Sequence, residues 1–276
     1  MAHLPVAKEM KLNSGTTIPT LGLGVFLVKS SKEISTGLSA GYRHIDSARY
    51  YQNEAEVGRA VRESGIPRDD IFVTTKVWLS DFGYESTKKA VQTSLQYLDG
   101  RIDLMLMHAP GDPSVRADTW RALEEAKAEG GVRDIGVSNF GIGHIEKLLQ
   151  TAKVVPAVNQ IELSPFLQRK DLVAYCRSKG IALEAYSPLG KGTREVLEDK
   201  TVRSVAQRQG RTNAQVLIRW SLQQGFITLP KSSNAQRQQS NLDVFSFELD
   251  DQDMEELDAL DRYLVTAWDP TTSDPV

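Results

Sequence analysis

Cysteine is almost absent from this chain of 276 residues, because Cys176 is the sole example. One thiol can form neither an internal disulfide bond nor a cysteine-based metal site. Such sparing use of cysteine is typical of a reducing compartment, so we expect a cytoplasmic protein. The histidines show neither an HxH nor an HExxH spacing, and we therefore expect no bound metal.

Long apolar runs and a charge excess are also missing. No stretch approaches the ~20 apolar residues needed to cross a bilayer, and the opening MAHLPVAKEM lacks the pattern of a secretory signal. Lys and Arg total 33 and Asp and Glu total 36, which gives a net charge of −3 with no basic stripe. We therefore expect neither a membrane nor a nucleic-acid partner.

The length alone permits two domains of about 150 residues or one α/β barrel of about 250 residues. Hydrophobic residues make up 40% of the chain and charged residues 25%, which is ordinary for a globular protein. No linker, low-complexity tract or shift in composition divides the sequence. We expect a single domain over residues 1–276.

Short apolar segments alternate with segments of helical periodicity along the chain. The strand candidates are continuous apolar runs, which is typical of parallel strands covered by helices. They are Leu21–Phe26, His44–Ser47, Ile71–Val77, Asp103–His108, Asp134–Ser138, Ala157–Leu163, Ala182–Ser187 and Phe226–Pro230. Eight such units predict the α/β class and a (β/α)8 TIM barrel. Met10–Pro19 predicts an N-terminal β-hairpin cap, and Asp250–Asp261 a C-terminal helix followed by a loop.

The competing architecture is an open, doubly wound sheet. Such a sheet is expected to carry a Gly-x-Gly-x-x-Gly fingerprint after an early strand. The nearest match, Gly22-Leu23-Gly24, lacks the third glycine. The barrel is therefore favoured.

Polar or ionisable groups stand at the ends of seven of the eight predicted strands. In a parallel barrel these ends form the functional face. Asp46, Lys76 and His108 end three successive strands, and Tyr51 follows Asp46 closely. Because buried charges are costly unless they are paired, their convergence at one end predicts an active site. An Asp–Lys pair is expected to lower the pKa of the neighbouring phenol, which makes Tyr51 a usable general acid, and a neutral His108 can bind a substrate oxygen.

Each of these residues, taken alone, also has a structural interpretation. Asp46 can be a helix N-cap or an ion-pair partner of Arg43 or Arg49, and Lys76 can be a surface lysine. The histidine can be a satisfied loop residue and the tyrosine a half-buried packing residue. It is the set on successive strand ends that favours acid–base chemistry.

Other candidates are weaker. His44 lies inside a strand and is expected to be structural, and His144 is expected on a polar helix face. Gly190–Thr193 fails the spacing of a phosphate-binding P-loop and is interpreted as a glycine-rich loop. Three aromatic residues are either core or the wall of a substrate pocket, namely Phe26, Trp78 and Trp268.

Seven motifs in register resemble those of the aldo-keto reductases. They are GYRHIDSARYYQNEAEVGRAV (Gly41–Val61), VTTKVW (Val73–Trp78), IDLMLMHAP (Ile102–Pro110), GVSNF (Gly136–Phe140), NQIELSP (Asn159–Pro165), AYSPLG (Ala185–Gly190) and LPKS (Leu229–Ser232). The resemblance covers roughly residues 9 to 262. It implies a (β/α)8 barrel that binds NADPH and reduces aldehydes and ketones.

The resemblance implies a catalytic tetrad of Asp46, Tyr51, Lys76 and His108, with Tyr51 as the general acid. It also implies a set of cofactor-binding residues for the nicotinamide and the pyrophosphate. These are Gly24, Ser138, Asn139, Gln160, Tyr186, Ser187 and Leu189.

Lys231, Ser232 and Arg237, with Asn241 beyond, are similar to the family's site for the 2′-phosphate and adenine. Two cations and a hydroxyl suit a dianionic phosphate, which favours NADPH over NADH. Several relatives carry Glu immediately before the Asn, where this chain has Ser240.

The resemblance therefore implies an NADPH-dependent carbonyl reductase acting on a small-molecule carbonyl substrate, and the family's leaning towards monomers implies a monomer. The loop Ala109–Asp118 is expected to be short and the pocket open and apolar. The alternative is a non-catalytic NADPH-binding barrel that acts as a redox sensor or partner subunit. A metal-dependent hydrolase on the same fold is disfavoured by the lack of clustered histidines.

Overall fold

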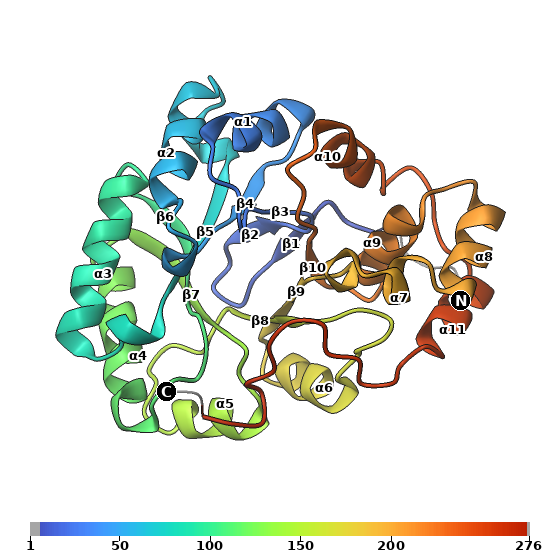
Figure 1. Cartoon of the computed structure of the whole chain (residues 1–276). Helices are drawn as coiled ribbons and strands as arrows, with labels where there is room; N and C mark the ends of the chain where they lie inside the picture. Colours follow the sequence, from blue (N-terminus) through green and yellow to red (C-terminus); the bar gives the residue numbers. More distant parts are fainter. Residues whose placement is uncertain (1–5, 275–276) are drawn as a thin grey trace.

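The computed structural model describes residues 6–274, and within them eight parallel strands form one nearly closed barrel ringed by helices (Figure 1). Neighbouring strands pair in chain order from first to last. The barrel strands are β3 (Leu23–Gly24), β4 (His44–Asp46), β5 (Phe72–Val77), β6 (Ile102–Met107), β7 (Val132–Ser138), β8 (Val158–Glu162), β9 (Ala182–Tyr186) and β10 (Ile227–Leu229). The predicted TIM barrel is confirmed.

Helices cover the outside of the barrel because each presents an apolar stripe to the strands. In α2, for example, Val57, Ala60 and Val61 are buried, while acidic Glu54 and Glu56 lie in its first turn. The helices are α1 (Ser31–Ala40), α2 (Glu54–Glu63), α3 (Tyr84–Tyr97), α4 (Pro113–Ala128), α5 (Ile142–Leu149), α6 (Lys170–Ser178), α7 (Arg194–Leu197), α8 (Lys200–Gln209), α9 (Asn213–Gln223), α10 (Ala235–Leu242) and α11 (Asp251–Asp258). Short 3₁₀ turns are η1 (Arg49–Tyr51), η2 (Arg68–Asp70), η3 (Leu79–Asp81) and η4 (Gly190–Gly192).

The barrel closes where the segment around β3 meets β10. Leu21 forms a parallel bridge to Thr228, and Gly24 forms one to Lys231. At Gly22, between the two bridges, a Cβ atom would lie 2.6 Å from Leu229 Cδ2 and 2.7 Å from His44 Nδ1. Glycine is required here because the first strand must pass close to both side chains.

The expected hairpin closes the N-terminal end of the barrel. Strand β1 (Glu9–Lys11) pairs antiparallel with β2 (Thr17–Pro19), and the side chain of Ile18 in β2 is fully buried. It packs with residues from the barrel interior in one apolar cluster, which we call the base. The base consists of Leu12, Ile18, Phe72, Leu104, Leu106, Ala157, Val158 and Ile227.

The C-terminal helix α11 is shorter than the predicted Asp250–Asp261. Asp250 is its N-cap and accepts a hydrogen bond from the Asp253 N–H at 2.8 Å. The following tail, red in Figure 1, ends beside α5. It lies at the end of the barrel opposite the hairpin, because Thr266 binds Glu162 at the end of β8, whereas Asn13 of the hairpin binds the Pro156 carbonyl before β8 begins. We call that opposite end, where the barrel strands finish, the mouth.

Two expectations about loops and histidines are wrong. The loop after β6 ends at Asp112, because Asp112 caps α4 and Pro113 begins it, so the predicted loop to Asp118 was too long. His144 is buried rather than on a polar face. Its Nδ1 accepts a hydrogen bond from the Gly141 N–H at 3.0 Å at the start of α5.

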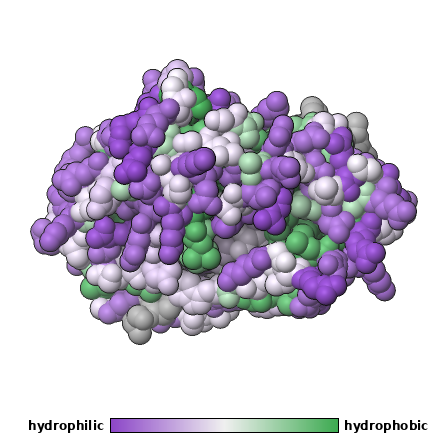
Figure 2. All heavy atoms as spheres, turned by 45° about the horizontal axis from the view of Figure 1, so that its top comes forward, coloured by the Kyte–Doolittle hydropathy of each residue, from purple (hydrophilic) through white to green (hydrophobic). Residues whose placement is uncertain are grey.

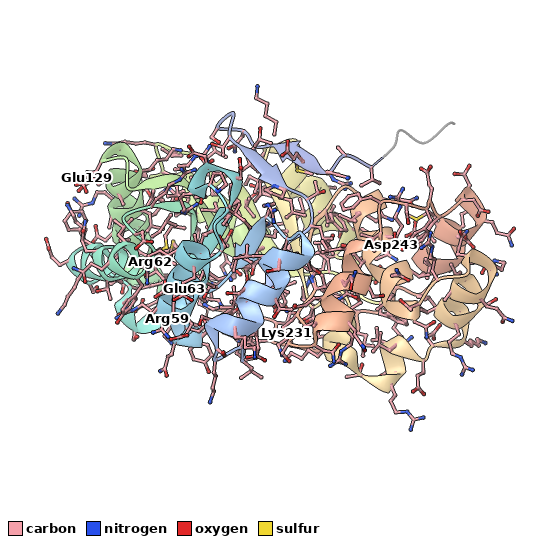
Figure 3. All side chains as sticks on the ribbon, turned by 90° about the horizontal axis from the view of Figure 1, so that it is seen from above. Arg59, Arg62, Glu63, Glu129, Lys231 and Asp243 are labelled. Carbon is pink, nitrogen blue, oxygen red and sulfur yellow. The ribbon has the colours of Figure 1, made fainter. Side chains whose placement is uncertain are left out.

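The surface is mostly hydrophilic (Figure 2), and charged side chains such as Arg59, Arg62 and Glu63 point outward from α2 (Figure 3). Among residues 6–274, no helix combines the length and apolar character needed to cross a membrane.

Candidate active site

The four predicted catalytic side chains come together at the mouth. Asp46 is the last residue of β4, Lys76 lies near the end of β5, and His108 immediately follows β6. Tyr51 ends the short η1 turn, which places its ring 5.8 Å from the ring of His108 and 5.1 Å from Lys76 Nζ. Parallel strands point their ends the same way, and this explains how residues far apart in the chain meet.

Asp46 and Lys76 form a buried ion pair. Lys76 Nζ donates to both Asp46 carboxylate oxygens at 2.8 Å and to the Ser47 carbonyl at 2.8 Å. Burial acts to lower the pKa of Lys76, but Asp46 and Tyr51 outweigh it, so the pKa is raised and the ammonium stays charged. The surface-lysine interpretation is therefore wrong.

The alternative roles for Asp46 are also wrong. Arg49 pairs instead with Asp81, at 2.6 Å, and Arg43 donates to the carbonyls of Leu38 and Tyr42. The carboxylate of Asp46 therefore binds Lys76, and it also accepts from Gln160 inside the barrel.

Tyr51 differs from the expectation in the direction of its pKa. Burial raises the pKa of the phenol, and the positive charge of Lys76 opposes burial without reversing it. The expected net lowering is therefore wrong for this structure. A raised pKa keeps the hydroxyl protonated at neutral pH, which is the form that a general acid requires.

His108 is held neutral. Burial, and then the charge of Lys76, lower the pKa of His108 well below its usual value. Its Nδ1 is buried and has no hydrogen-bond partner among the described residues. A neutral imidazole can donate a hydrogen bond from one ring nitrogen, and the position of the His108 ring beside the Tyr51 phenol suits the binding of a substrate oxygen.

Four of the predicted nicotinamide-binding residues form one hydrogen-bonded group beside the tetrad. Ser138 Oγ donates to the Gln160 carbonyl at 2.8 Å, and Asn139 Nδ2 donates to the His108 carbonyl at 2.9 Å. Asn139 has a φ of 61°, in the left-handed region that asparagine tolerates. Tyr186 OH donates to Asn139 Oδ1 at 2.8 Å, which fixes the ring at the mouth.

The residues predicted to meet the phosphates lie further along the mouth. Ser187, also with positive φ, and Leu189 follow β9 directly and lead into the glycine-rich turn η4. Gly24 and Lys231 are bridged to each other, so the nicotinamide and adenosine ends of the predicted site are connected through β3 and β10.

The predicted phosphate cations are exposed. Lys231, labelled in Figure 3, and Arg237 have no carboxylate ion-pair partner among residues 6–274. Ser232 and Asn241 are buried beside them, and the Asn234 N–H donates to Ser232 Oγ at 3.1 Å. Unneutralised cations next to a hydroxyl fit a dianionic phosphate.

The predicted pocket aromatics surround the tetrad. The Trp78 ring lies 5.0 Å from the His108 ring and 6.2 Å from the Trp268 ring, and Phe26 lies 5.0 Å from Tyr51. Tyr50 stacks on Trp78 at 4.1 Å. About two fifths of Phe26 and Trp268 is exposed, so these rings line an open apolar mouth rather than a sealed core.

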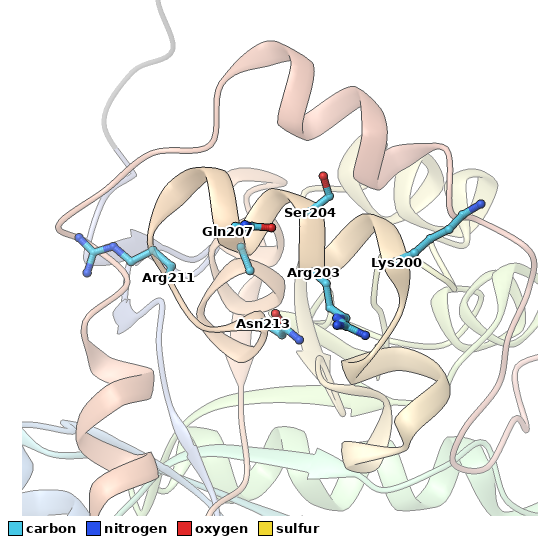
Figure 4. A pocket seen from close by; sticks show the side chains of 7 residues that line it. Lys200, Arg203, Ser204, Gln207, Arg211 and Asn213 are labelled. Atoms are coloured by element: carbon cyan, nitrogen blue, oxygen red, sulfur yellow. The ribbon is translucent and has the colours of Figure 1, made fainter.

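A second hollow lies away from this site. It has a volume of about 520 Å³ and is formed by α8 and its surroundings, with Lys200, Arg203 and Arg211 among its lining residues (Figure 4). None of the tetrad lines it. Within residues 6–274 no cluster of His, Cys, Asp and Glu is arranged to hold a metal.

The profile of the aldo/keto reductase family matches residues 29–262. The chain belongs to the aldo-keto reductase family. It is therefore an oxidoreductase of that family, as its motifs predicted.

Named relatives of this aldo-keto reductase match over nearly full length. The chain is 44% identical over 258 residues to a glyoxal reductase of Bacillus subtilis strain 168, covering 92% of each chain. It is 42% identical over 265 residues to a 9,11-endoperoxide prostaglandin H2 reductase of Trypanosoma cruzi strain CL Brener, covering 94% of this chain and 93% of the relative. The solved structure of MGS-M4, an aldo-keto reductase from a Medee basin deep-sea metagenome library, matches with a TM-score of 0.90 and 41% identity, covering 92% of this chain and 96% of that one.

Sequence reasoning missed the residues that hold the tail over the mouth of this aldo-keto reductase. Glu162, at the end of β8, accepts hydrogen bonds from the backbone N–H groups of Thr266 at 2.9 Å and Ala267 at 3.1 Å. Arg169 forms an ion pair with Asp269 at 3.0 Å. A carboxylate at a strand end was the available signal for Glu162, but its partners lie about a hundred positions away and are not readable from sequence.

It also missed Glu184, a charged residue inside the apolar run ALEAY of β9. Its side chain is fully buried and accepts a hydrogen bond from Gln160 Nε2 at 2.6 Å. A charge within an otherwise apolar strand was the signal that pointed to it.

Proposed function

We propose that this chain reduces aldehydes and ketones to alcohols with NADPH, and that Tyr51 is the general acid. The observation that carries the proposal is the pairing at the mouth of a protonated phenol and a neutral imidazole, backed by a buried Asp46–Lys76 ion pair. The family supports carbonyl reduction in general.

The tetrad can perform the proton chemistry of that reaction. A carbonyl oxygen between Tyr51 and His108 is in position to accept hydrogen bonds from both, where negative charge develops. Tyr51 supplies the proton, and the nearby Lys76 ammonium stabilises the phenolate that remains. The nicotinamide, when bound, supplies the hydride.

The residues present fit a nicotinamide cofactor carrying a 2′-phosphate. Lys231 and Arg237 would hold the 2′-phosphate with Ser232, and Asn241 lies one helical turn after Arg237 on α10. Gly24, bridged to Lys231, would lie between this end and the nicotinamide. Ser138, Asn139 and Gln160 would hold the carboxamide, and Tyr186 would stack on the ring. Ser187 and Leu189 would meet the pyrophosphate.

The aromatic mouth favours carbonyl compounds with a flat or apolar substituent. Phe26, Trp78 and Trp268 offer ring surface beside the tetrad. Glyoxal, an aromatic aldehyde and an aliphatic ketone form a suitable first panel.

The test is oxidation of NADPH by this panel, with two tyrosine variants. Tyr51→Phe should lower kcat by at least about 100-fold without weakening NADPH binding, because it removes the acid alone. Tyr50→Phe is the matched control, because its hydroxyl lies beside the site and has no proposed role; it should keep kcat within about threefold. NADPH binding without turnover of any carbonyl would overturn the proposal in favour of the non-catalytic barrel.

The cofactor assignment has its own test. Lys231→Ala combined with Arg237→Ala should raise the KM for NADPH by about 30-fold or more and leave that for NADH within about threefold. Lys200→Ala with Arg203→Ala removes two cations from α8 and is the matched control. Equal losses for both cofactors would contradict a 2′-phosphate site.

We further propose that residues 1–276 form one barrel domain that acts as a cytoplasmic monomer. Light scattering coupled to size-exclusion chromatography would test the monomer, and a dimer mass would contradict it.

A further inference from the structure

A layer of buried polar groups lies beneath the tetrad, inside the barrel, and the proposed mechanism does not use all of it. Glu184 on β9 and His44 on β4 are both fully buried, and Gln160 on β8 is nearly so. The base closes the barrel below them, and Glu184 and His44 have no solvent exposure. Buried polar groups of this kind require hydrogen-bond partners. The donors and acceptors around Glu184 and His44 indicate which of their atoms carry a proton.

Gln160 joins Glu184 to the catalytic ion pair. Its Nε2 donates to Asp46 Oδ2 at 2.8 Å and to Glu184 Oε2 at 2.6 Å. Both hydrogens of the amide nitrogen are therefore committed to carboxyl oxygens. The Oε1 carbonyl is left as the side of the amide that can face the carboxamide of a nicotinamide.

His44 faces the other oxygen of Glu184. Its Nδ1 lies 3.3 Å from the Pro19 carbonyl, which can only accept, so Nδ1 carries the hydrogen. Nε2 then accepts from the Thr74 hydroxyl at 3.0 Å, and Glu184 Oε1, which has no hydrogen-bond partner among the described residues, lies 3.6 Å from it. Two lone pairs would oppose each other there if Glu184 were ionised, whereas a proton on Oε1 relieves this repulsion.

Around Glu184, burial and the charge of Asp46 outweigh the Gln160 hydrogen bond and the charge of Lys76, which favour the carboxylate. Asp46, Lys76, His44 and Tyr51 are the titratable groups that face it from the neighbouring elements, and the hydrogen bonds of Lys76 go to Asp46 and Ser47 rather than to Glu184. Burial, then the charge of Asp46, raise the pKa of Glu184 to about 8. Burial lowers the pKa of His44 to about 4, so both members of the pair are neutral at neutral pH.

We propose that Glu184 is a positioning residue for the reaction: its protonated carboxyl locks the Gln160 amide beneath the nicotinamide site, and loss of that proton impairs cofactor placement and proton donation by Tyr51. The inference rests on the proposed function. An ionised Glu184 adds an unpaired negative charge below Asp46, which destabilises the phenolate that Tyr51 becomes on giving up its proton.

Glu184→Gln is the decisive variant, because a glutamine can accept from Gln160 and is uncharged at every pH, as the protonated acid is uncharged. At about pH 6.5 it should keep kcat and the KM for NADPH within about threefold of the wild type. Between about pH 7 and pH 9 the wild-type kcat/KM should fall about fivefold through Glu184, and Glu184→Gln should lack this step. Glu54→Gln alters another buried carboxyl, which accepts from Thr75 Oγ1 at 2.6 Å, and should keep the wild-type profile.

A second readout needs no turnover. Between about pH 4.5 and pH 8, Glu184 is protonated in the folded wild type and ionised in the unfolded chain. The free energy of unfolding therefore falls as the pH rises through this window. The Tm of Glu184→Gln relative to wild type should therefore increase from about pH 5 to about pH 8. A fluorescence titration should show NADPH affinity weakening about fivefold at high pH in the wild type but not in the variant.

An alkaline step that persists in Glu184→Gln, or a Tm difference that does not grow with pH, would overturn the inference. Failure of the proposed function looks different. In that case no carbonyl is reduced by the wild type, while the Tm difference still reports whether Glu184 is protonated in the folded chain.

Discussion

The two ends of this barrel are built on opposite principles. At the base, the hairpin covers apolar side chains such as Ile18, Leu104 and Leu106, which are fully buried and carry no polar atoms that need hydrogen-bond partners. At the mouth, an ion pair, a phenol and an imidazole are held among aromatic rings. The base contributes free energy by burial, whereas the mouth keeps groups whose burial costs free energy.

Backbone conformation follows the same division in part, although Asp99, just before β6 at the base end, also has a positive φ of 59°. Non-glycine residues with positive φ follow barrel strands at the mouth, including Leu27, Asn139, Arg169 and Ser187. Such conformations cost about 1–3 kcal/mol each for most residue types. The comparison teaches that stability gained at one end offsets strain and buried charge at the other.

The largest expected effect is at the mouth. Lys76→Met leaves Asp46 buried without its cation, which should lower the free energy of unfolding by about 3–5 kcal/mol and kcat by about 1,000-fold. Urea unfolding and steady-state kinetics measure the two effects. Adding Asp46→Asn should recover most of the stability and none of the activity; recovery of activity would contradict a chemical role for the pair.

At the base, Ile18→Ala should produce the converse result. Removing a fully buried side chain should cost about 2–5 kcal/mol of unfolding free energy, because a cavity remains beneath the hairpin. At a temperature where the variant stays folded, kcat and KM should match the wild type. A large fall in kcat there would show that the two ends are coupled.

Between the two ends, His44 should make stability sensitive to acid. Its pKa is about 4 when folded against about 6.5 when unfolded, so the unfolded chain binds the extra proton as the pH falls. Relative to His44→Gln, the wild type should lose about 2 kcal/mol between about pH 7 and pH 5. The wild type must be compared with His44→Gln because Glu184 changes the free energy of unfolding with pH in the opposite direction over the same pH range. A pH-independent difference would show that the pKa of His44 is the same in the folded and unfolded chains.

The smallest effect concerns the tail over the mouth. Glu162→Gln weakens the hydrogen bonds to Thr266 and Ala267 and should cost about 1 kcal/mol of stability. Because Trp268 follows directly, the KM for the carbonyl substrate should rise about threefold to tenfold with little change in kcat. Glu63→Gln, on the exposed face of α2, is the control and should change neither quantity.

Much of the architecture was predictable from local pattern. Each barrel strand lies at its predicted place, because apolar runs bounded by turn residues need no long-range information. Boundaries were less secure, as α4 shows: Asp112 and Pro113 start the helix within the predicted loop. His144 was misjudged because its burial depends on the packing of α5 and on the tail, not on its own helix.

The candidate tetrad was predictable for a similar reason. Strand order together with parallel direction is enough to bring Asp46, Lys76 and His108 to one end, and the motifs named them. The sign of the Tyr51 pKa shift was not predictable, because it depends on whether burial or the charge of Lys76 is larger.

The sequence by itself determined the barrel, its strand ends and the residue types available for catalysis, because these depend on periodicity and on short motifs. Only the tertiary structure decided which polar groups share a partner. Gln160 meets Asp46 across 114 positions and Glu184 across 24, and both contacts lie in a buried layer above the base. Protonation is set by such surroundings, and they exist only once the strands have closed around them.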